Sequence, residues 1–219
     1  MNKEEQWRGY YQSYFSKARQ RRVQPVQILD EEWFDGCTTA MCVTPYLAES
    51  AQVLEIACGI GRVSRFVAPR CGYLHCTDIL DEALAEARNN LADYPNVGFH
   101  KTNGYDLSIF DADRFDCVYS FTAFFHFDFE LVVNYFAEIK RVLKPGGVGI
   151  IEFKRWTKEE DVQQLLDKLE EQGGIQKYER ELDKWRYVSR ETLNLLCGFY
   201  RLKVLDDDVT KYTFRKQSE

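Results

Sequence analysis

From residue 52 to residue 153 the sequence alternates between short apolar runs and longer segments with helical periodicity. The apolar runs predict strands at residues 52–57, 73–78, 96–102, 114–120 and 147–153. The longer segments predict helices at residues 61–70, 81–94 and 129–143. Strands that alternate with helices in this way form a mostly parallel sheet with both faces covered. This alternation therefore predicts a doubly wound α/β fold.

The flanking segments extend this core within a single domain. Residues 1–50 predict helices, and residues 51–155 form the alternating core. Residues 156–219 predict two helices and then two strands, 201–207 and 210–216. These last strands must be antiparallel, because a parallel crossover needs about a dozen residues or more. The sheet should therefore have seven strands and end in an antiparallel hairpin.

Charge and cysteine usage narrow the functional classes. The net charge of −6 argues against a nucleic-acid binder, which usually carries a basic excess. The seven scattered cysteines lack CxxC spacing and favour reduced thiols over a disulfide framework. The N-terminus is too charged for a signal peptide, and no apolar run approaches the roughly 20 residues of a membrane span. We expect a cytoplasmic protein without membrane or nucleic-acid partners.

A glycine-containing loop, EIACGIG at residues 55–61, follows the first predicted strand of the core. Glycines at this position let the backbone turn tightly and let a ligand approach without meeting a Cβ atom. The third glycine of a dinucleotide loop is replaced by Ser64. Two glycines alone also suit an ordinary strand–helix turn, so the loop by itself leaves both interpretations open.

Two carboxylates favour a particular nucleotide. Asp78 ends the second strand about twenty residues beyond the glycines, where an acidic side chain can accept both ribose hydroxyls. Asp78 could instead cap the next helix, although Asp81 is better placed for that. Glu55 would repel a pyrophosphate but would suit an ammonium or sulfonium group. The pair therefore favours S-adenosylmethionine over NAD.

Four segments in order resemble one family. They are ExACGxGR, CTDILDEALAEAR, FDCVYSFTAFFHF and EIKRVLKPGGVGIIEF. Over residues 52–153 the chain resembles the class I S-adenosylmethionine-dependent methyltransferases, of the small-molecule type. The resemblance implies a Rossmann-like methyltransferase fold, with residues 1–50 as a helical lid and S-adenosylmethionine as cofactor.

The resemblance also implies cofactor contacts at ten positions. Ala57 stands where the family usually has Gly, and Asn103 where it usually has Asp, whose role an amide oxygen can still fill. Asp78 matches the ribose acid, Ile79 packs on adenine, and Gly104 offers its backbone to the ring. The full set is Glu55, Ala57, Gly59, Gly61, Asp78, Ile79, Asn103, Gly104, Ser120 and Phe121.

His126 is the candidate catalytic residue, because it follows the fourth core strand at the sheet edge where α/β ligands bind. It could act as a general base, or it could hydrogen-bond the cofactor or the local backbone. Aromatic residues of the N-terminal helices either line a substrate lid or pack as ordinary core. The lid candidates are Trp33, Tyr11 and Tyr14, with Trp7 and Tyr10 nearby. No cluster has metal-ligand spacing.

These features predict a methyltransferase acting on an N or O nucleophile of a small-molecule acceptor. A methyltransferase-like scaffold without catalysis is the main alternative, and N-methylation of a protein or peptide is another. A nicotinamide oxidoreductase would need the third glycine and a catalytic Tyr–Lys pair or His, and neither pattern is present. The sequence does not identify the acceptor or the oligomeric state.

Overall fold

A computed structural model describes residues 3–32, 35–154, 159–171, 173, 186–208 and 210–218. Its centre is a seven-stranded sheet in the order β3-β2-β1-β4-β5-β7-β6. The strands are β1 Gln52–Ile56, β2 Tyr73–Asp78, β3 Val97–Lys101, β4 Phe115–Ser120, β5 Leu143–Glu152, β6 Leu202–Asp206 and β7 Lys211–Lys216. Strands β1 to β5 pair in parallel, whereas β7 pairs antiparallel with both β5 and β6. The predicted fold and its terminal hairpin are confirmed.

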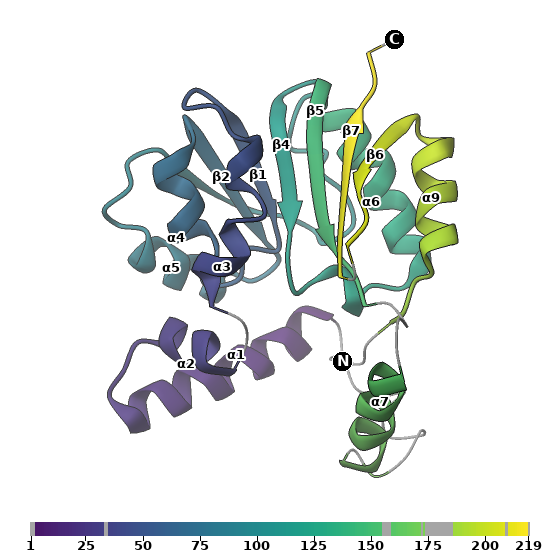
Figure 1. The fold of residues 1–219 in the computed structure, drawn as a ribbon. Helices are drawn as coiled ribbons and strands as arrows, with labels where there is room; N and C mark the ends of the chain where they lie inside the picture. The colour runs from purple at the N-terminus through teal and green to yellow at the C-terminus, as the bar shows by residue number, and fades with distance from the viewer. Residues whose placement is uncertain are drawn as a thin grey trace.

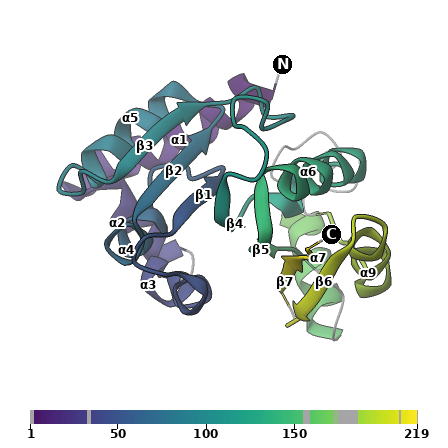
Figure 2. The ribbon, with the colours of Figure 1, turned by 90° about the horizontal axis from the view of Figure 1, so that it is seen from above.

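Helices cover both faces of the sheet. They are α1 Lys3–Arg21, α2 Pro25–Glu32, α3 Gly36–Ala40, α4 Ser64–Val67, α5 Asp81–Asn90, α6 Phe129–Val142, α7 Glu159–Glu171 and α9 Arg190–Phe199. One core cluster joins the sheet to α6 and α9, and a second joins it to α4 and α5. Seen from above, α6 and α9 lie on the side of the sheet opposite α3 and α4 (Figure 2). The central strands β1, β2 and β4 are therefore buried between two helical layers, whereas the strands at the two edges of the sheet, β3 and β6, are only partly buried.

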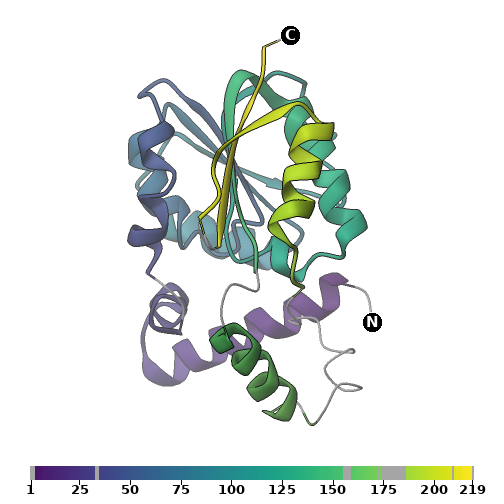
Figure 3. The same ribbon diagram turned by 45° about the vertical axis from the view of Figure 1, so that its right-hand side comes forward.

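The N-terminal helices pack at one end of the sheet. In Figure 1, α1 and α2 lie below the strands, at the end to which the arrow of β4 points, and α7 lies at the same end. In Figure 3 both α1 and α7 lie beneath the sheet. A third cluster joins α1 and α2 to Ile60, Leu80 and Ala83, which lie just beyond β1 and β2. These helices therefore cover the carboxyl ends of the parallel strands.

Several predicted boundaries are wrong. The helix expected at residues 81–94 ends at Asn90. The helix expected at residues 61–70 is only α4, Ser64–Val67, followed by a 3₁₀ turn at Ala68–Arg70, since Pro69 cannot continue an α-helical ladder. The strand expected at 147–153 begins earlier, at Leu143, directly after α6. Its register against β4 shifts between Phe115 and Cys117, so the glycines at 146 and 147 form an irregular stretch of strand.

All seven cysteines lie within the described residues. All seven cysteines are free thiols. Within this described part, no helix has the length and apolar character needed to cross a membrane.

Candidate functional site

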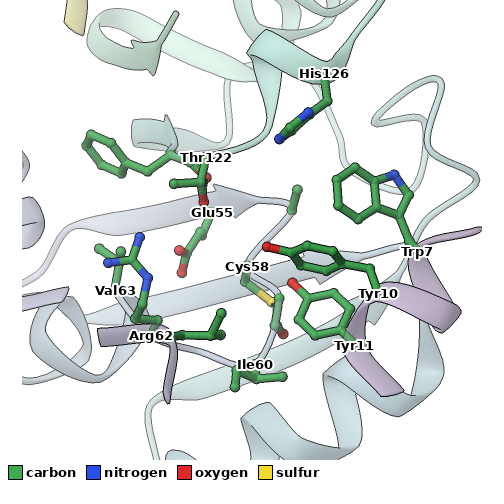
Figure 4. Close-up of a pocket in the computed structure, with 14 residues that line it drawn as sticks. Trp7, Tyr10, Tyr11, Glu55, Cys58, Ile60, Arg62, Val63, Thr122 and His126 are labelled. Carbon is green, nitrogen blue, oxygen red and sulfur yellow. Dashed lines mark hydrogen bonds between the residues drawn. The ribbon is translucent and has the colours of Figure 1, made fainter. Parts of the chain in front are cut away.

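A pocket opens where β1 and β4 lie side by side. Strand order reverses here, β2 lying on one side and β5 on the other, and ligands of open α/β sheets bind at the carboxyl ends of such strands. The pocket encloses about 590 Å³, part of it open to solvent. Its lining residues are Trp7, Tyr10, Tyr11, Leu29, Glu55, Ala57, Cys58, Gly59, Ile60, Arg62, Val63, Phe121, Thr122 and His126 (Figure 4).

Glu55 places a carboxyl group in the wall of the pocket. It lies in β1, is only 3% exposed, and accepts hydrogen bonds from the hydroxyls of Ser64 and of Tyr119, the latter at 2.8 Å. Burial raises the pKa of Glu55 to about 7, although both hydroxyls act in the opposite direction. The carboxyl is therefore poised between its neutral and charged forms, and a bound cation would favour the charged form.

The loop after β1 turns through three left-handed residues. Ala57, Gly59 and Gly61 have φ values of 56°, 55° and 81°. Gly61 needs to lack a side chain, since a Cβ atom would lie 2.8 Å from Leu91. Ala57 adopts the left-handed region despite its Cβ atom, at a cost of roughly 1–2 kcal/mol. The loop backbone is thus held in a conformation that exposes it to the pocket.

Asp78, at the end of β2, holds this loop in place. Its carboxylate accepts the backbone N–H of Gly59 at 2.9 Å and that of Leu80 at 3.0 Å. Burial nevertheless raises the pKa of Asp78 to about 6. The Leu80 contact is a turn ahead of α5, whose N-cap is Leu80 and which has no side-chain cap, while the Gly59 contact joins Asp78 to the glycine loop. Asp81 makes no side-chain cap.

The segment after β4 forms the opposite wall. Thr122 has a φ of 58°, and its N–H donates to Glu152 at the end of β5 at 2.6 Å. His126 ends the following 3₁₀ turn, Phe124–His126, and its ring meets that of Trp7 edge to face at 5.1 Å. Figure 4 shows the rings of His126 and Trp7 on the same side of the pocket. A histidine therefore faces the same space as Glu55 and the glycine loop.

Comparison with known proteins agrees with this geometry. Residues 53–147 match the family described as Methyltransferase domain. Residues 53–147 therefore carry a class I S-adenosylmethionine-dependent methyltransferase domain. The cofactor of this family is S-adenosylmethionine.

Individual relatives resemble this methyltransferase domain more distantly. A curated relative, ribosomal RNA small subunit methyltransferase A of Rubrobacter xylanophilus, is 32% identical over 96 residues. That match covers 44% of this chain and 34%, about a third, of the relative. An S-adenosylmethionine-dependent methyltransferase of Methanosarcina mazei matches with a TM-score of 0.62 at 20% identity, over 81% of this chain and 98% of that one. The YcgJ protein of Bacillus subtilis gives 0.62 at 15% identity, over 82% and 97%.

The predicted site residues fall into two groups, according to whether they line the pocket. The first group lines the pocket and comprises Glu55, Ala57, Gly59, Phe121, His126 and Tyr11. The second group lies outside the lining and comprises Gly61, Asp78, Ile79, Asn103, Gly104, Ser120 and Tyr14. Trp33, the remaining lid candidate, lies outside the described residues. The open pocket therefore contains one end of the predicted cofactor site.

Several members of the second group have other contacts. The Asn103 amide oxygen accepts the N–H groups of Tyr105 and Asp106, at 2.8 and 3.1 Å. The hydroxyl of Ser120 donates to the carbonyl of Ile56 at 2.8 Å, which ties the ends of β4 and β1 together. Tyr14 is buried, and its hydroxyl pairs with that of Tyr10 at 3.0 Å. These contacts position the loops around the methyltransferase pocket.

Sequence reasoning gave no role to six lining residues. They are Leu29, Cys58, Ile60, Arg62, Val63 and Thr122. Four of them are chain neighbours of the glycines, so proximity to Gly59 and Gly61 was an available signal. Arg62 is the notable omission, because it is only 7% exposed and yet lines the pocket. Leu29 had no such signal, since only the packing of α2 brings it near the loop.

Proposed function

We propose that this chain transfers a methyl group from S-adenosylmethionine to a nitrogen or oxygen nucleophile of a small-molecule acceptor. The observation that carries the proposal is the buried Glu55 beside the glycine loop, with a pKa near 7. Such a group disfavours phosphate and favours a ligand with a positive charge. The methionine half of the cofactor combines a sulfonium and an ammonium, so it suits this end of the pocket.

The proposed cofactor site runs along the carboxyl ends of β1, β2 and β4. The loop backbone at Ala57, Gly59 and Gly61 would contact the methionine half, together with Ser120 and Phe121 beyond β4. Asp78 would bind the ribose. At the adenine end we favour Ile79 and the backbone of Gly104 over the Asn103 amide, whose oxygen already accepts two backbone N–H groups.

The protein's part in the reaction would be alignment and proton removal. S-adenosylmethionine supplies an already activated methyl group when bound. The pocket residues would hold the acceptor in line with that methyl and exclude water, which accounts for much of the rate gain in such reactions. His126 faces the pocket and would take the proton of a hydroxyl or ammonium acceptor. While α1 is docked, the Trp7 ring packs edge to face on the His126 ring.

A small molecule is favoured as acceptor over RNA. The pocket is partly closed by Trp7, Tyr10 and Tyr11 of α1, and the chain carries a net charge of −6. RNA binding usually requires a basic surface. The curated relative is named for ribosomal RNA, but it matches over only 34% of its own length. Methylation of a peptide, or a scaffold role without catalysis, remain the alternatives to be tested.

The proposal extends to the organisation of the chain. Residues 1–219 would form one domain, with residues 1–50 as the lid, 51–155 as the cofactor core and 156–219 as helices and hairpin. Seven free cysteines fit a reducing compartment such as the cytoplasm.

Calorimetric titration of the full chain with S-adenosylmethionine, S-adenosylhomocysteine and NAD tests the cofactor assignment. We expect both adenosyl amino acids to bind and NAD to give no heat of binding. NAD binding without a response to the other two would overturn the proposal, and no binding of any ligand would support the scaffold alternative. Tritium transfer from labelled S-adenosylmethionine to pools of amines, phenols, peptides and RNA then identifies the acceptor class.

A further inference from the structure

Tyr11 of α1 reaches into the glycine loop. Its hydroxyl oxygen lies 2.3 Å from the position that a Cβ atom on Gly59 would occupy. Gly59 also has a positive φ of 55°. Its missing side chain therefore leaves a space against the loop backbone, and the hydroxyl of Tyr11 fills that space. The space beside Gly59, which was expected to accept a ligand, is therefore occupied by the Tyr11 side chain.

The loop residue that Tyr11 contacts is also hydrogen-bonded to the proposed ribose acid. Gly59 donates its N–H to the Asp78 carboxylate at 2.9 Å, so the filled space adjoins that carboxylate. Burial raises the pKa of the Tyr11 phenol, and the charge of Asp78 raises it further. A hydroxyl group held against this glycine occupies space that the loop would offer to a ligand.

At the adjacent adenine end, α1 and α2 pack near one of the predicted residues, Ile79. Ile79 packs against the hydrophobic cluster of α1 and α2, which includes Tyr11 and Phe15. Neither Asp78 nor Ile79 lines the pocket, whereas Tyr11 does. The described structure therefore leaves the Glu55 end open and closes the Asp78 end with α1.

We propose that Tyr11 occupies the space beside Gly59, within the proposed cofactor site, while α1 is docked, so that α1 and the cofactor compete and α1 acts as a gate. The inference rests on the proposed function and adds to it how the site is opened. Docking is reinforced at the surface by the ion pairs of Arg8 with Glu82, at 2.7 Å, and of Lys101 with Glu4, at 3.4 Å. Exposed pairs of this kind contribute about 0–1 kcal/mol each, so they do not prevent opening.

The test uses the full chain and the association rate of S-adenosylhomocysteine, measured by stopped-flow fluorescence. Tyr11→Ala removes the side chain that fills the space beside Gly59. It should raise the association rate at least about tenfold, because the binding-competent fraction of the protein rises. Tyr11→Phe keeps the ring and removes the hydroxyl, so it should give a smaller increase. Gln12→Ala changes an exposed neighbour on the same helix and should leave the rate unchanged.

Hydrogen–deuterium exchange of the wild-type chain tests the gate without a substitution. Amides of residues 3–21 should exchange faster when S-adenosylhomocysteine is bound, because the ligand displaces Tyr11 and undocks α1. Unchanged or slower exchange there would overturn the gate, as would equal association rates for wild type and Tyr11→Ala. If neither folded protein binds the ligand at all, the proposed function itself has failed. The two failures are thus distinguishable.

Discussion

The two ends of the proposed cofactor site both contain a buried carboxyl group, but the groups are held differently. Glu55 accepts from the hydroxyls of Ser64 and Tyr119, whereas Asp78 accepts from the backbone N–H groups of Gly59 and Leu80. Hydroxyl hydrogens can rotate as the charge of their partner changes, but backbone N–H groups are fixed by the fold. Glu55 can therefore respond to a ligand's charge, while Asp78 also maintains the loop.

The two ends of the proposed cofactor site also differ in how a ligand can reach them. The Glu55 end opens into a pocket, and the Asp78 end lies beneath α1. In both places burial raises the pKa, to about 7 for Glu55 and about 6 for Asp78. The two carboxyl groups thus have similarly raised pKa values, although only the Glu55 end opens into the pocket. A raised carboxyl pKa marks a region of functional interest, but packing decides whether a ligand reaches it directly.

The largest expected effect concerns the stability contributed by Glu55. The folded protein retains the Glu55 proton up to about pH 7, while the unfolded chain releases it near the ordinary value of 4.5. The contribution is therefore full below pH 4.5 and is lost as the pH rises through 7. At about 1.36 kcal/mol per pH unit, this difference amounts to roughly 3 kcal/mol.

Urea denaturation of wild type and Glu55→Gln between pH 4 and pH 8 measures this contribution. Glutamine is uncharged throughout, so the free energy of unfolding of the variant should rise relative to wild type as the pH increases. The difference between the two proteins removes the contributions of Asp78 and Glu152, which also titrate. Parallel pH profiles would show that Glu55 has an ordinary pKa. The comparison of two buried carboxyl groups with raised pKa values would then fail.

Next in size is the effect of Asp78→Ala on cofactor affinity. Loss of the carboxylate should weaken S-adenosylhomocysteine binding at least about tenfold, because hydrogen bonds to a charged group contribute about 1.5–3 kcal/mol each. Isothermal titration of the variant measures the change, and thermal unfolding controls for loss of the contacts to Gly59 and Leu80. Unchanged affinity in a folded variant would remove Asp78 from the site and leave the Glu55 end alone.

The sequence predicted the sheet and the pocket loop because both depend on local pattern. Strand alternation, the glycines and the carboxylates at strand ends are encoded over a few residues each. The position of α1 is not encoded locally. Aromatic residues such as Tyr11 fit either a lid or a core, and only tertiary packing places the Tyr11 hydroxyl against Gly59. The side-chain contacts of Asn103 were likewise invisible, since they depend on the turn that follows it.

A smaller effect is expected at Ala57, which adopts a left-handed conformation at the open end. Ala57→Gly should stabilise the protein by about 0.5–1 kcal/mol, because relief of left-handed strain exceeds the added chain entropy of glycine. For a chain of this size the melting temperature should rise by about 1–4 °C, measurable by calorimetry. Ala85→Gly, at an exposed position of helix α5, is the matched control and should destabilise the protein by about 1 kcal/mol. Destabilisation by both would mean that the Ala57 methyl packs productively.

The smallest effect is expected from Asn103→Ala, which tests whether Asn103 contacts the cofactor or only stabilises its own turn. The amide oxygen of Asn103 accepts from Tyr105 and Asp106, and its NH₂ group donates to the Asp106 carboxylate at 2.8 Å. With these groups engaged in the turn, removal of the side chain should change S-adenosylhomocysteine affinity by less than about threefold, or about 0.6 kcal/mol. Titration calorimetry beside Asp78→Ala gives the comparison directly. A tenfold loss would restore Asn103 to adenine recognition and would mean that the turn rearranges when α1 leaves.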